Sequence, residues 1–457
     1  MQELNYPVDK NIEALGEIFK KNSHTLYIVG GAIRDYILNK KTSDIDFATS
    51  ATPEEMLRIF PHSIKTGIKH GTLTIPFRRN HYEITTFRID GEYKDSRHPE
   101  NITFTNELRE DLKRRDFTIN AMAADCKNGA IIDEFSGIDD INKRIVRTVG
   151  NPKKRFEEDA LRMLRAIRFA TVLNFNIEEE TFNAIIEQSG NINKISKERI
   201  QSEFFKIILS PFAERGVLLL QKSALLDKIF PSLEKCFHFK PAGGRKKRAK
   251  DQLLSTHILN VFRYVVLNNA SISLRLAALF HDISKPETYA LNNGVISFHL
   301  HEIKGSEKTR KILKELKCSN AIIDKTCTLI KYHMVNYTPA WSDKAIRKLI
   351  LNIGKDNLND FLLLYQADLS DMSDEIILRN ANEFLMRLEK INNDDTALTI
   401  KDLKINGNDL KNLGYNGKEI GKILDYLHEA VLDDPLSNTN KNLINLAKAY
   451  KENTEQY

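Results

Sequence analysis

The chain has 457 residues, 41% of them hydrophobic and 28% charged, and a formal net charge of +6. This length exceeds what one hydrophobic core accommodates, so we expect roughly three domains, and the mild positive charge is compatible with a polyanionic partner. No apolar run approaches the ~18 residues of a membrane span, and the four scattered cysteines form no C-x-x-C pair. We therefore expect a cytoplasmic protein with reduced thiols and neither secretion nor membrane anchoring.

The first informative stretch joins a double glycine to a pair of aspartates. Gly30 and Gly31 carry no Cβ, so their backbone can approach a phosphate, and Arg34 presents a planar fork of donors suited to phosphate. Asp44 and Asp46 flank one residue, so in a strand both carboxylates face the same side. Such a pair beside a phosphate-binding loop predicts a Mg²⁺ site. The alternative is a turn aspartate next to a solvated one.

Residues 1 to about 25 predict a helix, and from 26 to about 149 short β-rich runs alternate with helices, as in an α/β or α+β domain. Alternating β-branched residues predict strands over 72–76 and 82–87. We expect a polar loop over 88–112. After it, the charged run that ends in Arg115 and Asp116 leads directly into an apolar segment, as at the mouth of a site.

After about residue 150 the strand signals stop, and we expect helices to the end of the chain. Residues 156–169 predict an amphipathic helix with an acidic start. Asp159 and Arg162 are three apart and would be neighbours on its surface. Arg165 and Arg168 continue the row, but it drifts around the helix, so Asp159 and Arg168 cannot reach the same small atom. The alternative is a plain ion pair on a surface helix.

The segment 240–250 is basic and contains glycine, which indicates a domain boundary. It is either a solvated loop or a phosphate contact to RNA, which would make binding depend on salt. In the last sixty residues, Gly407, Gly414 and Gly417 lead into predicted helices. They either cap these helices or present amides to a nucleic-acid phosphate.

Four motifs in a fixed order carry a resemblance to a known family. They are Gly30-Gly31-x-x-Arg34-Asp35, Asp44-x-Asp46, Arg114-Arg115-Asp116-Phe-Thr-Ile-Asn-Ala and Glu158-Asp159-x-x-Arg162. Together they resemble the class II tRNA nucleotidyltransferase and bacterial poly(A) polymerase family, within the polymerase-β-like superfamily. The resemblance covers essentially the whole chain.

This resemblance implies an α+β fold with a polymerase-β-like nucleotidyltransferase head followed by all-α parts. The head would span 1–149 and a helical neck with an RNA-binding region 150–239. A body with an HD domain would span 240–395, and a helical tail that binds tRNA 396–457. The implied partners are tRNA, CTP and ATP, without a membrane. The sequence leaves the oligomeric state open.

The implied activity is template-independent addition of CCA to the 3′ end of tRNA. Asp44 and Asp46 would hold two Mg²⁺ ions, and Gly31 and Arg34 would grip the triphosphate. The resemblance assigns the remaining nucleotide contacts to Arg114, Arg115, Asp116, Asp159, Arg162, Arg165 and Arg168, with Asp116 on a 2′-hydroxyl and the Asp159–Arg162 pair on the base. Glu83 is either a third carboxylate near the metals or an ordinary surface residue.

A second set of residues resembles the metal site of HD domains. The resemblance makes His257, His281, Asp282 and Asp368 ligands of a transition metal such as Ni²⁺ or Mn²⁺. His301 and His333 match the additional histidines of active HD phosphohydrolases. Either the HD domain hydrolyses phosphoesters, as a second or even the main activity, or it is a degenerate fold kept as an RNA-binding body.

The product of the head is a further open point, because CCA addition, CC-only addition, A-only addition and poly(A) synthesis share these motifs. The family uses the loop between the first catalytic motifs to switch from C to A. This chain retains that loop with Tyr93, Asp95, Arg97 and Pro99, which favours complete CCA addition. A pure RNA-binding protein is disfavoured by the intact Asp44 and Asp46.

Overall fold

A computed structural model of the chain describes residues 4–41, 45–91, 102–241, 253–370, 374–393 and 399–455. By its internal contacts the chain divides into two compact units. The first comprises Met1–Lys235 with Glu315–Cys318, and the second Cys236–Lys314 with Ser319–Tyr457. The predicted four-part division remains a prediction, although one of its boundaries, after residue 239, lies close to the division between the units.

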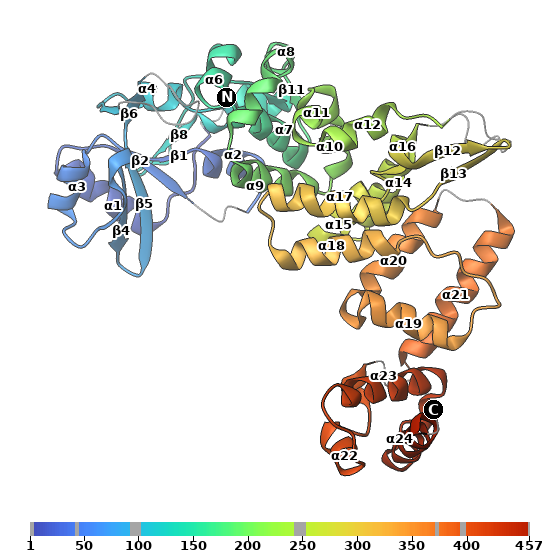
Figure 1. Cartoon of the computed structure of the whole chain (residues 1–457). Coiled ribbons are helices and arrows are strands. Elements are labelled where there is room, and N and C mark those ends of the chain that lie inside the picture. The colour runs from blue at the N-terminus through green and yellow to red at the C-terminus, as the bar shows by residue number, and fades with distance from the viewer. Residues whose placement is uncertain are drawn as a thin grey trace. The chain divides into compact units, whose positions relative to one another are not determined.

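The first unit is built on a seven-stranded mixed sheet with the order β3-β4-β5-β2-β1-β8-β9 (Figure 1). Its strands, in that order, are Ile64–Gly67, Thr72–Phe77, Asn80–Thr86, Asp46–Thr49, Leu26–Val29, Ala123–Asp125 and Ile131–Ile132. β2 and β5 are parallel, with Phe47 opposite Ile84, and every other pair in the sheet is antiparallel. The predicted strands over 72–76 and 82–87 are therefore confirmed as β4 and β5.

Apolar side chains at alternate positions of these strands form the core of the sheet. Ile28, Phe47, Leu73 and Ile84 are each at most 1% exposed, and burying each such side chain contributes about 1.5–3 kcal/mol. α1 and α2 contact β1, while α3 contacts β4. β1 ends at Val29, and Gly30 forms the turn that leads from it into α2.

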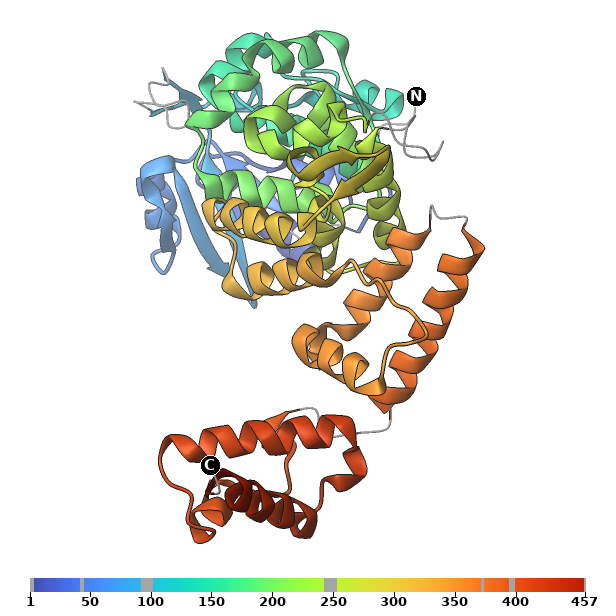
Figure 2. The same cartoon turned by 45° about the vertical axis from the view of Figure 1, so that its right-hand side comes forward.

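The helices of the first 238 residues surround this sheet and continue beyond it (Figures 1 and 2). They are α1 Lys10–Lys21, α2 Gly31–Ile37, α3 Pro53–Ile59, α4 Leu108–Lys113, α5 Gly137–Lys143, α6 Pro152–Glu158, α7 Leu161–Leu173, α8 Glu179–Gln188, α9 Lys197–Ile208, α10 Ala213–Lys222, α11 Leu225–Ile229 and α12 Pro231–His238. The predicted mixture of strands followed by helices is confirmed.

Three local predictions are wrong. The expected helix over 156–169 is two helices, because Asp159 is extended (φ −144°, ψ 104°) and separates α6 from α7. The expected loop over 88–112 contains β6 Arg88–Asp90, its antiparallel partner β7 Ile102–Phe104, and α4. Strands also occur after residue 150, since β11 Asn176–Ile177 pairs with β10 Ile145–Val146, and β12 Tyr289–Asn292 forms a hairpin with β13 Val295–Phe298.

The second unit is otherwise helical. Its helices are α14 Leu254–Leu267, α15 Ile272–Phe280, α16 Lys285–Thr288, α17 His301–Glu315, α18 Asn320–Tyr332, α19 Asp343–Ile353, α20 Leu358–Leu369, α21 Glu375–Asn393, α22 Gly407–Asn412, α23 Lys418–Asp433 and α24 Asn440–Glu455. Among the described residues, no helix of either unit combines the length and the apolar character that crossing a membrane requires.

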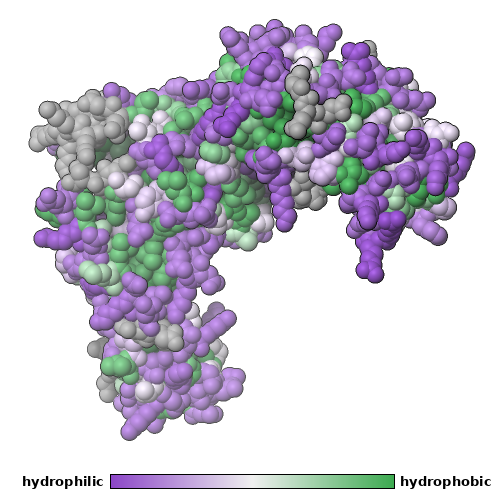
Figure 3. All heavy atoms as spheres, turned by 180° about the vertical axis from the view of Figure 1, so that it is seen from behind, coloured by the Kyte–Doolittle hydropathy of each residue, from purple (hydrophilic) through white to green (hydrophobic). Residues whose placement is uncertain are grey.

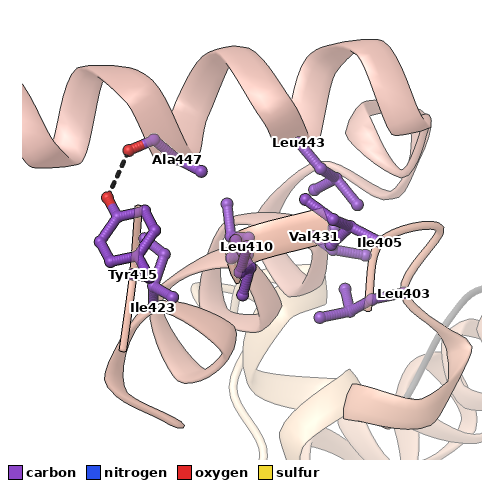
Figure 4. Close-up of a cluster of buried hydrophobic side chains, with 9 residues drawn as sticks. Leu403, Ile405, Leu410, Tyr415, Ile423, Val431, Leu443 and Ala447 are labelled. Carbon is purple, nitrogen blue, oxygen red and sulfur yellow. Dashed lines mark hydrogen bonds between the residues drawn. The ribbon is translucent and has the colours of Figure 1, made fainter. Parts of the chain in front are cut away.

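The last three helices have a core of their own (Figure 4). Leu410, Ile423 and Leu443 are fully buried there, and the Tyr415 hydroxyl donates a hydrogen bond of 2.6 Å to the Ala447 carbonyl. The visible outer surface of these helices is mostly hydrophilic (Figure 3). Gly414 has a φ of +83° directly after α22, which is the conformation of a helix cap.

Candidate functional site

A cavity of about 680 Å³ lies beside the end of β1 in the first unit. It brings together every described head residue that the motifs single out as nucleotide-binding or catalytic. Its lining residues are Gly30, Gly31, Arg34, Asp46, Arg114, Arg115, Asp116, Asn120, Asp159, Leu161, Arg162, Arg165, Arg168, Phe169, Arg199 and Lys206. Eight of these described residues are cationic and three are acidic, so the cavity attracts anions.

The double glycine makes the turn from β1 into α2 and brings backbone close to an arginine. Gly30 has a φ of +77°, and a Cβ on it would stand 3.0 Å from Nη1 of Arg115. In the first turns of α2, Arg34 donates to Asp35 from Nε at 2.9 Å and to the Asn120 side chain from Nη1 at 2.6 Å. The Arg34 fork is therefore held in one orientation at the cavity wall.

Asp46 begins β2, is exposed, and lines the cavity. Asp44 lies outside the described residues, so the expected convergence of the two carboxylates remains a prediction. Glu83 on β5 is exposed as well, and the described residues that line the cavity do not include it. Because Ile84 is in register with Phe47 in parallel strands, Glu83 and Asp46 lie on the same face of the sheet. Both interpretations of Glu83 therefore stay open.

Asp111 is a fully buried carboxylate that organises two cavity arginines. Its Oδ1 accepts from Arg114 at 2.8 and 3.0 Å, and its Oδ2 accepts from Arg115 at 3.3 Å. Burial by itself raises the pKa of Asp111, but attraction to these two guanidinium groups outweighs it and lowers the pKa. Asp111 is thus ionised, and it fixes where Arg114 and Arg115 point.

Asp116 is a second buried carboxylate that is held in the same way. Its Oδ1 accepts from the Phe117 amide at 2.8 Å and from Asn120 at 3.2 Å, and Oδ2 accepts from Nε and Nη2 of Arg165 at 2.8 and 2.5 Å. Burial raises its pKa, and attraction to Arg165 more than reverses this. A carboxylate has about four acceptor sites, so a ribose hydroxyl reaches Asp116 only if one of these donors yields.

Asp159 and Arg162 do not form the ion pair that their spacing in one helix suggests. Asp159 lies between α6 and α7, where its Oδ1 accepts a hydrogen bond of 3.0 Å from the amide of Leu161, the first residue of α7. Its Oδ2 accepts from Nη2 of Arg199 at 2.7 Å. Arg162 instead pairs with Glu158 and donates to two backbone carbonyls. Both side chains still line the cavity, but they do not contact each other, and each is held by its own partners.

The guanidinium carbon of Arg168 lies over the ring of Phe169, 3.8 Å from its centre. Its Nε also donates to Oε2 of Glu203 on α9 at 2.5 Å. Glu203 is buried, and its other oxygen has Lys206 at 3.5 Å. Glu203 is therefore the acidic partner of Arg168.

Sequence reasoning missed five lining residues: Asn120, Leu161, Phe169, Arg199 and Lys206. Asn120 and Leu161 lie inside motifs that were recognised for their charged members, and Phe169 is the last residue of the predicted helix over 156–169. Arg199 and Lys206 are seven apart on α9, with Glu203 between them, which is the spacing of one helix face. That polar stripe was the signal that could have identified them. However, the other segments that line the cavity are at least thirty residues away in the sequence.

A second cluster gathers four histidines and two aspartates in the second unit, and we name it the histidine–aspartate cluster: His257, His281, Asp282, His301, His333 and Asp368. Nε2 of His257 lies 3.0 Å from Asp368 and 3.2 Å from Nε2 of His281. Oδ2 of Asp282 lies 3.3 Å from His281, and its Oδ1 lies 3.4 Å from His301 and 3.8 Å from His333. The six predicted residues are thus brought together.

The three buried histidines share one orientation. Nδ1 of His281, His301 and His333 lies 2.7–2.9 Å from a backbone carbonyl three residues earlier. A carbonyl only accepts, so each Nδ1 carries a proton and each ring turns its Nε2 to the centre. Burial lowers the pKa of His333 to about 4 and also lowers the pKa of His301, so Nε2 of both rings is unprotonated.

This geometry leaves lone pairs facing one another. Oδ1 of Asp282 and the Nε2 atoms of His301 and His333 are buried and accept no hydrogen bond within the described part of the chain. Burial would raise the pKa of Asp282, but nearby positive charge, including Lys285 at 2.6 Å from Oδ2, holds it well below the usual range. Three electron-pair donors around one buried space fit a metal ion. Two ligand groups share Asp282: one with His257 and His281, the other with His301 and His333.

The buried Arg168–Glu203 pair gives a prediction about stability. Replacing Arg168 by Ala leaves the Glu203 carboxylate buried with only a weak, largely exposed partner in Lys206, so we expect a loss of about 3–5 kcal/mol in the free energy of unfolding. Denaturant unfolding of the nucleotide-free protein measures it. Lys206→Ala is the matched control, for which we expect less than about 1 kcal/mol. Equal effects of the two substitutions would show that Arg168 does not stabilise the fold.

Comparison with known proteins adds to this geometry. Profiles of three families match the chain: "Poly A polymerase head domain" over residues 26–147, "Probable RNA and SrmB- binding site of polymerase A" over 174–237, and "tRNA nucleotidyltransferase domain 2 putative" over 293–447. The crystal structure of the Bacillus stearothermophilus CCA-adding enzyme in complex with CTP is similar, with a TM-score of 0.72, 27% identity and 98% of each chain covered.

Two sequence relatives are informative. The CCA-adding enzyme of Anoxybacillus flavithermus is 47% identical over 46% of this chain, and that alignment spans only about half of the relative, 52%. The CCA-adding enzyme of Enterococcus faecalis is 32% identical over 98% of this chain and 96% of its own length. Because this second similarity extends over nearly the whole of both chains, the protein belongs to the family of CCA-adding enzymes.

Proposed function

We propose that this protein adds CCA to the 3′ end of tRNA from CTP and ATP, with protein side chains in place of a nucleic-acid template. The observation that carries the proposal is the cavity itself. It combines the Asp46 carboxylate at a strand end with eight cationic side chains, of which Arg162 is one. It also contains the Asp159 carboxylate, which with Arg162 offers an acceptor and a donor to a base. A nucleoside triphosphate needs all three: cations for its phosphates, a carboxylate for its metal, and hydrogen-bonding groups for its base.

Asp46, together with Asp44, would hold Mg²⁺, which lowers the pKa of the attacking 3′-hydroxyl and neutralises the pyrophosphate that leaves. The exposed Asp46 carboxylate at the edge of a cationic cavity is a hard oxygen ligand, so it fits this ion. Arg34, kept in place by Asp35 and Asn120, is positioned to hold the phosphates. Gly31 leaves room for them, because a Cβ there would approach Nη2 of Arg34 to 3.3 Å.

Base choice in this proposal comes from acceptor and donor sites that the fold leaves unused. Asp159 uses one acceptor site on each oxygen, for Leu161 and Arg199, and keeps the others for the exocyclic amine of cytosine or adenine. Arg162 engages only its terminal nitrogens with Glu158 and two backbone carbonyls, so it retains donors for a ring nitrogen. Uracil and guanine present a carbonyl where Asp159 needs a donor, so both are rejected.

Complete CCA addition, rather than CC-only, A-only or poly(A) synthesis, is proposed because of the retained loop. Its residues Tyr93, Asp95, Arg97 and Pro99 lie outside the described residues. The tRNA partner is proposed by analogy with the CCA-adding enzymes, and one similar structure is that of the Thermotoga maritima CCA-adding enzyme complexed with tRNA. We further propose the cytoplasm as the site of action, since tRNA processing of this kind takes place there.

We predict that Asp46→Ala abolishes incorporation of labelled CTP and ATP into tRNA that lacks its terminal CCA. Asp46 is exposed, so the circular dichroism spectrum should stay that of the wild type. Glu83→Gln, on the same face of the sheet, is the comparison variant. Unchanged incorporation by it would make Glu83 a surface residue, and a loss as complete as that of Asp46→Ala would make it a third catalytic carboxylate. Normal incorporation by Asp46→Ala would contradict the proposed site.

Arg199 should act as a positioning residue for Asp159. We predict that Asp159→Ala lowers the preference for CTP and ATP over UTP and GTP by roughly tenfold or more, because a lost hydrogen bond to the base costs about 1–3 kcal/mol. Arg199→Ala should lower it in the same direction, with a smaller effect. Steady-state kcat/KM values for the four nucleotides measure this. Glu198→Ala, exposed on the same helix, should keep the selectivity. Full selectivity in Asp159→Ala would move base reading elsewhere.

A second function is favoured by the histidine–aspartate cluster: hydrolysis of phosphoesters by a metal-dependent HD domain. His257, His281, Asp282 and Asp368 would be the ligands, with His301 and His333 on the other oxygen of Asp282. A transition metal such as Ni²⁺ or Mn²⁺ would lower the pKa of a bound water. The observation in favour is that Oδ1 of Asp282 and Nε2 of His301 and His333 are buried and accept no hydrogen bond within the described part of the chain. An RNA-binding body does not require such a set of electron-pair donors.

We predict that the purified protein binds Ni²⁺ or Mn²⁺ and that His301→Ala lowers the affinity at least tenfold. Metal content after loading and desalting, measured by mass spectrometry, gives the readout. His299→Ala removes an exposed histidine two residues away and should bind metal like the wild type. Incorporation of CTP into tRNA by both variants reports that they are folded. A wild type that retains no metal would exclude the metal-dependent function.

A further inference from the structure

We propose that Phe169 is a positioning residue for nucleotide binding, whose ring holds three arginines of the head cavity where they can meet the phosphates. This inference rests on the proposed nucleotidyl transfer and adds to that site a side chain without a polar atom. Phe169 lies on α7, is 5% exposed and lines the cavity. It stands there among eight cationic residues, and these are the surroundings in which the negative face of a ring matters.

The guanidinium groups of three cavity arginines lie over the ring of Phe169. The guanidinium carbon is 3.8 Å from the ring centre for Arg168, 5.1 Å for Arg34 and 5.5 Å for Arg165. All three distances fall within the ~6 Å over which a ring face attracts a cation. The ring is therefore a common neighbour of three cations that the cavity presents.

Two separate helices bring these arginines to the ring. Arg165 precedes Phe169 by one helical turn on α7, so their side chains are neighbours on the helix surface. Arg168 is adjacent to Phe169 in the sequence. Arg34 belongs to α2, which begins directly after the Gly30 turn. The ring thus connects the arginine proposed to hold the phosphates with two arginines from a helix far away in the sequence.

A ring does for these arginines what further acids could not do. Each arginine already has one acidic partner: Asp35 for Arg34, Asp116 for Arg165 and Glu203 for Arg168. Burial lowers the pKa of Arg168, and the charge of Arg165 lowers it as well, against the opposite effect of Glu203. The guanidinium groups therefore repel one another. A ring face attracts each of them without carrying a net charge, so it holds them together and leaves their charge for the phosphates.

The ring can fix these flexible side chains because its own position is fixed by the core. Phe117 packs edge-on against Phe169, with the ring centres 5.6 Å apart and the ring planes at 76°. Phe117 is fully buried, and its amide donates a hydrogen bond of 2.8 Å to Asp116. The same short segment thus anchors both the ring and the acid that holds Arg165.

The first experiment changes the charge of the ring face and little else. Phe169 is replaced by mono-, tri- and pentafluorinated phenylalanine in the full-length protein through codon suppression. Fluorine withdraws electron density from the ring face, so its attraction to cations falls along the series. We expect the Kd of ATP, measured by titration calorimetry, to rise along the series and to be at least fivefold higher for the pentafluorinated ring. A constant Kd would overturn the inference.

Phe204 supplies the matched control. It is fully buried on α9 and packs against Phe230, with the ring centres 4.7 Å apart, and it does not line the cavity. Pentafluorinated phenylalanine at this position should bind ATP with the affinity of the wild type. An equal loss of affinity at both positions would show that fluorination acts through core packing, and this would contradict the proposed role of Phe169.

The second experiment asks whether the ring acts on the phosphates. Phe169→Leu keeps an apolar side chain but removes the ring face. Because the three arginines are proposed to meet the phosphates, ATP should lose more affinity than AMP, and we expect the ratio of their Kd values to change at least threefold. Equal losses for the two nucleotides would show that Phe169 supports the nucleoside or the fold, and would overturn the inference.

The inference and the proposed function fail separately. A wild type that adds no nucleotide to tRNA lacking its CCA end would overturn the proposed function. A wild type that adds CCA, with an ATP affinity that does not respond to fluorination of Phe169, would overturn this inference alone.

Discussion

The head of this protein depends on holding many arginines around one cavity. Like charges this close repel one another, and arginine side chains are long and flexible. Buried carboxylates solve both problems: Asp111 holds Arg114 and Arg115, and Asp116 holds Arg165. Each of these acids stays ionised despite burial because its guanidinium partners lower its pKa. The result is a rigid, positively charged wall whose remaining donors are directed into the cavity.

The same principle positions the groups that we propose read the base. Asp159 is fixed at both oxygens by the start of α7 and by Arg199, and Arg162 is fixed by Glu158 and two backbone carbonyls. Neither depends on the other for its orientation. A pair that is held apart in this way keeps a donor and an acceptor free for a third molecule, whereas a direct ion pair would use them up. The break between α6 and α7 makes this arrangement possible.

The two candidate sites of the chain differ in the charge that their side chains leave unbalanced. In the head cavity Asp116 and Asp159 are paired with arginines, and the cationic side chains outnumber the acidic ones. The surplus charge is therefore positive and fits phosphates. In the histidine–aspartate cluster the histidines and Asp282 present electron pairs to one another, so the surplus is negative and fits a metal ion. This contrast underlies the separate functions proposed for them: nucleotidyl transfer in one and metal binding in the other.

Much of the head site could be predicted from the sequence because its residues lie in short local motifs. The helix break at Asp159 could not, since an aspartate in the first turn of one helix and an aspartate between two helices look alike in sequence. The Asp159–Arg199 contact joins residues forty apart and depends on helix packing. The β12–β13 hairpin had a signal, because Asn293-Gly294, with positive φ at both residues, is the typical hairpin turn.

The claim at the centre of this account is that protein side chains select the nucleotide. Sequencing the 3′ ends of a tRNA lacking CCA, after incubation with equal concentrations of all four nucleoside triphosphates, tests it most directly. The account predicts that the ends read CCA and extend no further. Frequent uridine or guanosine at these positions, or long runs of adenosine, would contradict it.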